Sequence, residues 1–165
     1  MLANLFERWC LWMQARGSCK ITYLNSGGRT GPAVKYMERY YLLRLFGWAL
    51  FLHCFHSSDP EGVHDHPWDW FSFILAGWYH EEGADGSVRG RGFWSLKLGQ
   101  AEVFHRIHID PLMRGRVWTL FGHGQRRRVW GYLEPGQPWR ADPKNFGREQ
   151  YVGHIFPRLV ERSAS

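Results

Sequence analysis

The sequence predicts an all-β fold, a single antiparallel β-barrel or sandwich with one helix at its N-terminus. Short apolar segments alternate with turn residues at near-regular spacing, which is typical of antiparallel barrels. Aromatic residues make up 17% of the 165 residues, and aromatic side chains favour pleated, half-buried strand surfaces. The chain shows no regular alternation of strands and helices, which argues against a parallel α/β fold.

The N-terminal helix is expected at Leu2–Arg16. Apolar side chains recur there at helical spacing, at Leu2, Leu5, Phe6, Trp9 and Met13. Gly17 follows as a stop signal. Packing of this helix on the barrel wall is favoured over a membrane helix or a helix that binds a partner. The glycine-rich segment 25–32 is expected to form a loop.

We expect residues 34–133 to form the barrel, with at least seven strands. The predicted strands are Val34–Leu45, Ala49–His56, Trp70–His80, Gly92–Leu98, Glu102–Ile109, Val117–Gly122 and Arg128–Leu133. Residues 1–33 contribute the helix and loop, and residues 134–165 form a C-terminal extension on the surface. Within that extension, residues 149–160 could dock as a short strand or helix. The whole chain, residues 1–165, is expected to be one domain.

Charge and cysteine content narrow the choice of partner and compartment. The formal net charge is +6 and the isoelectric point is about 9.5. The arginines are scattered, except at Arg126, Arg127 and Arg128, whereas nucleic-acid binders concentrate their charge on one face. Three cysteines without a CxxC spacing predict no disulfide framework. No apolar run reaches 18 residues, so we expect a cytoplasmic protein that binds neither membrane nor nucleic acid.

Two histidines carry the strongest chemical signal. His64 and His66 lie two residues apart, so on a strand both side chains project to the same side. Two converging imidazoles suit a divalent ion such as Fe, Zn, Ni or Mn. A later predicted strand holds His105 and His108. These two differ in strand parity, so only one of them can face inward with the pair.

The segment from His64 onward resembles the first motif of the cupins, a His-x-His pair followed by a Glu and then a Gly. His64, His66 and Gly77 match that motif, and the Glu position falls on Trp70. Further matches are the segments "FHRI", "WTLF" and "RRRVWGY" at residues 104–107, 118–121 and 126–132. Together they resemble small uncharacterised cupin-like proteins of phages and bacteria. The resemblance implies a jelly-roll barrel and a metal site, with His105 at the second-motif position as the third ligand.

The departure at Trp70 leaves three alternatives open for the site. The first is a metal ion held by three histidines with open positions for ligands, which would resemble the thiol dioxygenases. The second is a substitute carboxylate from Asp69, although strand alternation points that side chain the other way. The third is that the site binds no metal.

The remaining expectations concern the pocket and the activity. Trp68, Trp70, Trp118 and His53 are expected to line a cavity beside the metal. The favoured function is a metal-binding cupin, in one version an Fe(II) dioxygenase-like enzyme acting on a small molecule. The alternatives are a non-catalytic cupin that binds a small ligand, or a phage structural or host-interaction protein in the cytoplasm of a bacterial host. The oligomeric state is left open, and a homodimer is one of the alternatives.

Overall fold

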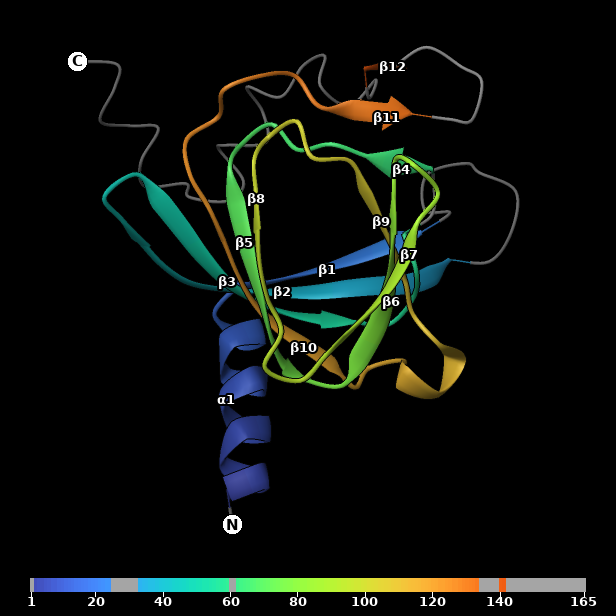
Figure 1. The fold of residues 1–165 in the computed structure, drawn as a ribbon. Helices are drawn as coiled ribbons and strands as arrows, with labels where there is room; N and C mark the ends of the chain where they lie inside the picture. The colour runs from blue at the N-terminus through green and yellow to red at the C-terminus, as the bar shows by residue number, and fades with distance from the viewer. Residues whose placement is uncertain (1, 25–32, 60–61, 134–139, 142–165) are drawn as a thin grey trace, which may run out of the picture.

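The computed structural model describes residues 2–24, 33–59, 62–133 and 140–141. Two six-stranded antiparallel sheets face each other, and one helix, α1 (Leu2–Ala15), lies outside them (Figure 1). In spatial order, the first sheet consists of β1 (Cys19–Leu24), β2 (Val34–Leu45), β3 (Trp48–Phe55), β10 (Val117–His123), β5 (Trp70–Ala76) and β8 (Leu96–Gly99). The second consists of β12 (Arg140–Ala141), β11 (Gly131–Leu133), β4 (Val63–His64), β9 (His105–His108), β6 (Trp78–Gly83) and β7 (Val88–Gly92). A single 3₁₀ turn, η1 (Pro111–Met113), precedes β10 within these ranges.

The interior is filled by side chains that alternate along the strands. One part is an apolar core made by Met37, Phe55, Ile74, Tyr79, Ile107, Ile109 and Val117. A second part is mainly aromatic and consists of Ala49, Phe51, Trp70 and Phe121. The aromatic part adjoins the histidines, because the Phe121 ring lies 6.4 Å from that of His66. The barrel interior thus has an apolar core and an aromatic part beside the histidines, which we call the aromatic compartment.

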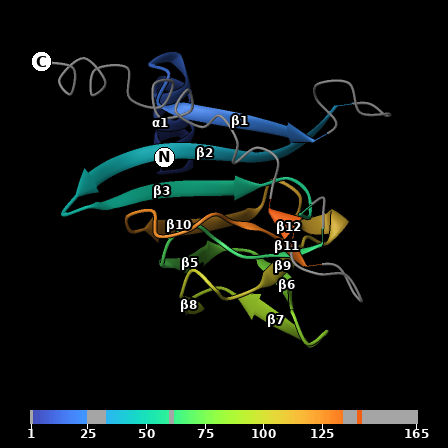
Figure 2. The same ribbon diagram turned by 90° about the horizontal axis from the view of Figure 1, so that it is seen from above.

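Helix α1 covers the outer face of the first sheet. Cys10 and Met13 of the helix pack against Tyr40 of β2 and Leu52 of β3, as the expected amphipathic pattern requires. Figure 2 shows β1, β2 and β3 as a row with the helix on one side of it. The structure therefore confirms that the helix packs on the barrel wall. Among the described residues, no helix has both the length and the apolar character needed to cross a membrane.

Two of the expected strands are each divided between the two sheets. The segment Trp70–His80 forms β5 in one sheet and β6 in the other, with Gly77 between them. Gly77 has a φ of +74°, and a Cβ there would lie 2.7 Å from the carbonyl oxygen of Arg116. The chain can therefore turn and pass close to β10 only at a glycine. Likewise, Gly92–Leu98 is divided between β7 and β8, and Trp94 has a φ of 65° at the turn.

Other strand boundaries also differ from the expectation. The segment Glu102–Ile109 contains only the four-residue β9, and Arg128–Leu133 contains only β11. Strands β1, β4 and β12 were not expected, because two of them are only two residues long and β1 follows the helix after a single tight turn. Residues 149–160 lie outside the described residues. The all-β class with an N-terminal helix is confirmed.

Candidate metal centre

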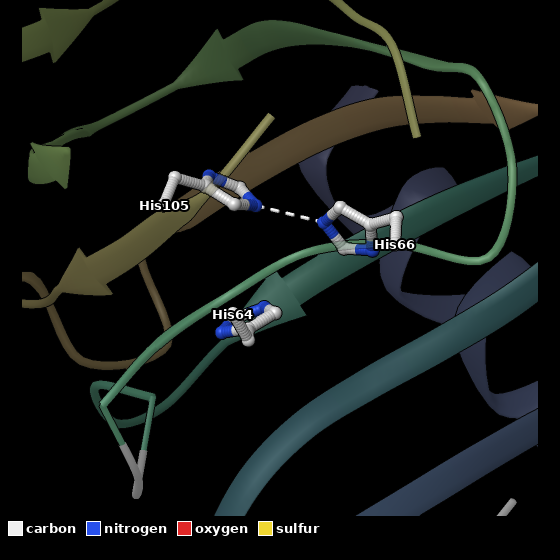
Figure 3. A group of neighbouring side chains, drawn as sticks. All are labelled: His64, His66 and His105. Atoms are coloured by element: carbon white, nitrogen blue, oxygen red, sulfur yellow. Dashed lines mark hydrogen bonds between the residues drawn. The ribbon is translucent and has the colours of Figure 1, made fainter. Parts of the chain in front are cut away.

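Three imidazoles converge in the interior, and they come from separate places in the chain. His64 ends β4, His66 follows in the next loop, and His105 begins β9 (Figure 3). One ring nitrogen from each residue lies within 4.8 Å of the corresponding nitrogens of the other two. His64 and His105 are directly paired across neighbouring strands, and Nε2 of His66 lies 2.8 Å from Nε2 of His105. The three nitrogens therefore surround one point.

A buried carboxylate orients the third imidazole. Glu81 of β6 is 5% exposed, and its Oε1 lies 2.8 Å from Nδ1 of His105. Lys97 also donates to this carboxylate, and Arg91 Nε lies 3.0 Å from Oε2. Burial raises the pKa of Glu81, but the hydrogen bonds from His105 and Lys97 outweigh it and bring the pKa to about 2. Because Glu81 is ionised, His105 carries its proton on Nδ1 and presents Nε2 to the cluster.

The environment keeps the imidazoles of His66 and His105 neutral. Burial, followed by the charges that His105 and His64 would carry, lowers the pKa of His66 well below its usual range. Burial also lowers the pKa of His105, although the hydrogen bond to Glu81 opposes this shift. A neutral imidazole is the form that binds a metal ion. Both residues are therefore ready to act as ligands at neutral pH.

The residues present fit a divalent metal ion. Ligand nitrogens about 2.0–2.2 Å from one ion, at tetrahedral or octahedral angles, lie roughly 3 Å or slightly more apart. The 2.8 Å contact between His66 and His105 needs only a small widening to reach that spacing. Three imidazoles suit Fe, Zn, Ni or Mn and leave further coordination positions open.

Trp70 stands where a cupin carboxylate would be expected and forms an aromatic wall instead. It is 3% exposed. Its ring stacks on that of His105 with centroids 4.9 Å apart, and it lies edge-on to His66 at 5.1 Å. Gly99 is its partner on β8, and a Cβ at Gly99 would lie 2.2 Å from Cε2 of the indole. The indole can therefore adopt this position only because residue 99 is a glycine.

Asp69 does not substitute for the missing carboxylate. Its Oδ1 accepts a hydrogen bond from the backbone N–H of Ala101 at 3.0 Å. Nη1 of Arg127 donates to both carboxylate oxygens, at 2.8 and 2.6 Å. Strand alternation already turned this side chain away from the interior. The alternative of an Asp69 ligand is therefore wrong for this arrangement.

Three of the four expected pocket residues lie beside the aromatic compartment, namely Trp70, Trp68 and His53. Trp118 does not. Trp68 lies 6.4 Å from the ring of His66. His53 is 3% exposed and stacks on Phe121 at 4.9 Å. Trp118, in contrast, packs on the outer face of the sheet against α1 and Tyr40. The reason is strand parity: Phe121 faces inward on β10, so a residue three positions earlier faces outward.

The structure also separates the two candidate histidines of β9. His105 is 5% exposed and faces the cluster. The side chain of His108 is 37% exposed, and its Nε2 lies 2.7 Å from Oε2 of Glu82. Regular alternation along β9 accounts for the difference. The expectation of His105 rather than His108 agrees with this geometry.

Sequence reasoning missed two acidic residues that hold the site together. Glu81 was not among the expected site residues, although it has the same strand parity as buried Tyr79. Asp65 lies between His64 and His66 and is completely buried. It accepts a hydrogen bond from the N–H of Gly131 at 2.6 Å and pairs with Nη2 of Arg128 at 3.1 Å. A charged residue inside a His-x-His pair was the only available signal.

The segment at residues 126–132 lies over this loop. Backbone N–H groups of Arg127 and Arg128 donate to the carbonyl of Pro67. Beyond them, the rings of Trp130 and Tyr132 lie 6.1 and 5.9 Å from that of His64. The arginine cluster is therefore a local clamp on the histidine loop as well as a group of surface charges. We call residues 126–132 the arginine strap.

Comparison with solved structures identifies the fold. A cupin-2 domain protein from Rhodospirillum rubrum superposes with a TM-score of 0.51, at 13% identity, over 69% of this chain and 76% of that one. This chain has the cupin fold. Two further cupin-like structures are a double-stranded β-helix protein from Klebsiella pneumoniae, at 12% identity, and an RmlC-like cupin from Shewanella frigidimarina, at 15%. They cover 63% and 66% of this chain and 90% and 87% of their own, with TM-scores of 0.48 and 0.45.

Sequence comparison adds nothing to the structural match. No protein-family model matches the chain, and no curated protein matches it significantly. The Rhodospirillum rubrum structure is only 13% identical to this chain, so it shows the cupin fold alone. The chemistry of the three-histidine cluster must therefore be argued from this chain's own residues.

Proposed function

We propose that this chain is a metal-binding cupin in which His64, His66 and His105 hold one divalent ion beside a small-molecule substrate. The observation that carries the proposal is the convergence of three ring nitrogens within 4.8 Å inside an all-β barrel. The ionised Glu81 behind His105 supports it, because carboxylates behind ligating histidines raise metal affinity. We further propose an Fe(II) dioxygenase-like activity, in which the ion supplies redox chemistry with O₂.

The surrounding residues have separate tasks in this proposal. Trp70 and Phe121 wall the centre and exclude water, which strengthens electrostatic interactions inside it. Glu81 keeps the proton of His105 on Nδ1, so that Nε2 stays available as a ligand. The absent carboxylate leaves a coordination position for a substrate. We propose a cytoplasmic location for this activity.

Two alternatives have observations of their own. A non-catalytic ligand-binding cupin is supported by the aromatic compartment, which would hold a small molecule with or without turnover. A phage structural or host-interaction role, or a homodimer, is supported by exposed apolar side chains. These include Phe46 at 92%, Leu98 at 75% and Trp94 at 69% exposure.

Elemental analysis of the purified protein tests the metal site. The wild type is expected to bind about one divalent ion per chain, and the His64→Ala, His66→Ala double variant should lose most of it. The control is His108→Ala, which removes an outward-facing histidine and should leave metal content unchanged. Full occupancy in the double variant would refute the proposal. Oxygen consumption by the iron-loaded protein then separates a dioxygenase from a binding module.

A further inference from the structure

A row of polar side chains crosses the inner face of the first sheet beside the histidine cluster. Arg39 of β2 pairs with His53 of β3, and His53 pairs with Thr119 of β10. Nε of Arg39 donates to Nε2 of His53 at 3.0 Å. Barrel interiors are normally filled by apolar side chains. A charged guanidinium inside the barrel is therefore unusual and suggests a functional role.

The guanidinium faces the same compartment as the metal centre. Its Cζ lies 5.4 Å from the centroid of the Phe51 ring, and His53 stacks on Phe121, which adjoins His66. Burial is the main cause of the low pKa of His53, and the positive charge of Arg39 adds to it. Arg39 is thus connected to the candidate ligands through His53 and Phe121.

Thr119 supplies an independent observation. It is 1% exposed, and its hydroxyl has no hydrogen-bond partner among the residues that the structure describes. Buried hydroxyls in proteins are nearly always paired with protein, water or ligand. On β10, Thr119 has the same parity as inward-facing Phe121. Its hydroxyl therefore lies on the inner face, in the same row as Arg39.

We propose that this compartment binds a small organic carboxylate, with Arg39 as its anchor and Thr119 as a second hydrogen-bond donor. The inference rests on the proposed function and names the substrate class of that site. A guanidinium carries five N–H donors in a rigid plane and matches a carboxylate geometrically. The contact with His53 sets the orientation of this plane. Aromatic walls lower the local dielectric constant, so that an anion gains more here than in water.

The charge of the proposed metal centre also favours an anionic ligand. Three neutral imidazoles leave a bound divalent ion with its full charge, because Trp70 replaces the carboxylate that would offset half of it. The nearby Glu81 is already shared by Lys97 and Arg91. A carboxylate ligand would therefore offset part of the positive charge of both the ion and Arg39.

Calorimetric titration with matched probes tests the proposal. Glycolate and 3-hydroxypropanoate are each compared with the neutral amide of the same acid, on zinc-loaded and on metal-free protein. In the wild type each acid should bind about tenfold tighter than its amide or better, a difference typical of a charge-assisted hydrogen bond. Arg39→Gln should remove about tenfold of the acid affinity and leave amide binding and zinc content unchanged. Thr119→Val should cost the acids about threefold.

Controls separate this inference from the metal site. Arg114→Gln removes an exposed arginine near η1 and should change nothing. If Arg39→Gln does not fold, Arg39→Lys keeps the charge but loses the planar fork, and should weaken acid binding about threefold. Wild-type acid affinity in the folded Arg39 variants overturns the proposal, and so does equal binding of acid and amide by the wild type. Failure to bind zinc refutes the metal site alone, because the metal-free titration still reports the acid preference.

Discussion

At the scale of single residues, the candidate metal centre depends on groups other than the three histidines. Glu81 is the clearest example, because it receives His105, Lys97 and Arg91 together inside the barrel. Its low pKa shows that these partners outweigh the cost of burying a carboxylate. The consequence is a fixed tautomer of His105, with Nε2 turned toward the other two histidines.

Replacing Glu81 with glutamine should weaken metal binding by about 10–100-fold. The neutral amide no longer enforces a proton on Nδ1 of His105, and Lys97 loses its counter-charge. The measurement is the dissociation constant for zinc by competition with a chromophoric chelator. The matched control is Glu82→Gln on the same strand, because Glu82 pairs with the outward-facing His108. Equal affinities in the two variants would contradict the role given to Glu81.

At the scale of elements, the arginine strap holds the loop that carries two of the histidines. Asp65 lies between them and is completely buried, with Gly131 and Arg128 as its partners. Asp69, at the other end of the loop, pairs with Arg127 in a more exposed position. The first pair is inside the protein, and the second is close to solvent. Their contributions to stability should therefore differ.

Arg128→Gln is expected to lower the free energy of unfolding by about 2–3 kcal/mol, because it leaves the buried charge of Asp65 without its cation. It should also reduce zinc affinity, since His64 and His66 flank Asp65. Urea denaturation and chelator competition measure the two effects. The control is Arg127→Gln, which removes the exposed pair with Asp69 and should be close to neutral. Similar losses in both variants would mean that burial of Asp65 is not what matters.

At the scale of the whole molecule, the barrel encloses several imidazoles that burial keeps neutral. Burial, with the charges of Arg39 and Arg44 adding to it, lowers the pKa of His123 to about 4. Burial also lowers the pKa of His53 and His66 well below the usual range. An unfolded chain protonates these histidines near pH 6.5, whereas the folded chain resists protonation until the pH is much lower. Acid therefore favours the unfolded state.

The metal-free protein should accordingly lose stability as the pH falls below about 6.5. The folded-state pKa values are depressed, so this stability is complete above the unfolded pKa and is lost down to the folded one. His123 alone should contribute a loss of ~2–3 kcal/mol by pH 4. Glu81 extends the loss between about pH 4.5 and 2. Urea denaturation at pH 7.5, 6, 5 and 4 measures the loss due to the histidines, and an unchanged free energy of unfolding across this range would contradict the expectation.

The sequence by itself determined those features that depend on local periodicity and on turn residues. The all-β class, the N-terminal helix and the projection of His64 and His66 to one side follow from spacings of 3.6 and 2 residues. Strand parity showed that only one of His105 and His108 can face inward, and the resemblance to the second cupin motif selected His105. The alternation of buried and exposed side chains follows the sequence pattern wherever a strand is regular.

Only the tertiary structure decided which sheet each strand joins and which side chains meet across the interior. Trp118 was expected in the cavity and lies under α1, because parity fixes a side chain's face relative to its neighbours but does not say which face is inside. Glu81 joins His105 because β6 and β9 pair, and the chain passes from β5 to β6 at Gly77. The carboxylate behind the candidate metal centre and the arginine beside it come from strands distant in sequence. Such long-range pairings depend on the packing of the whole barrel, and no local spacing encodes them.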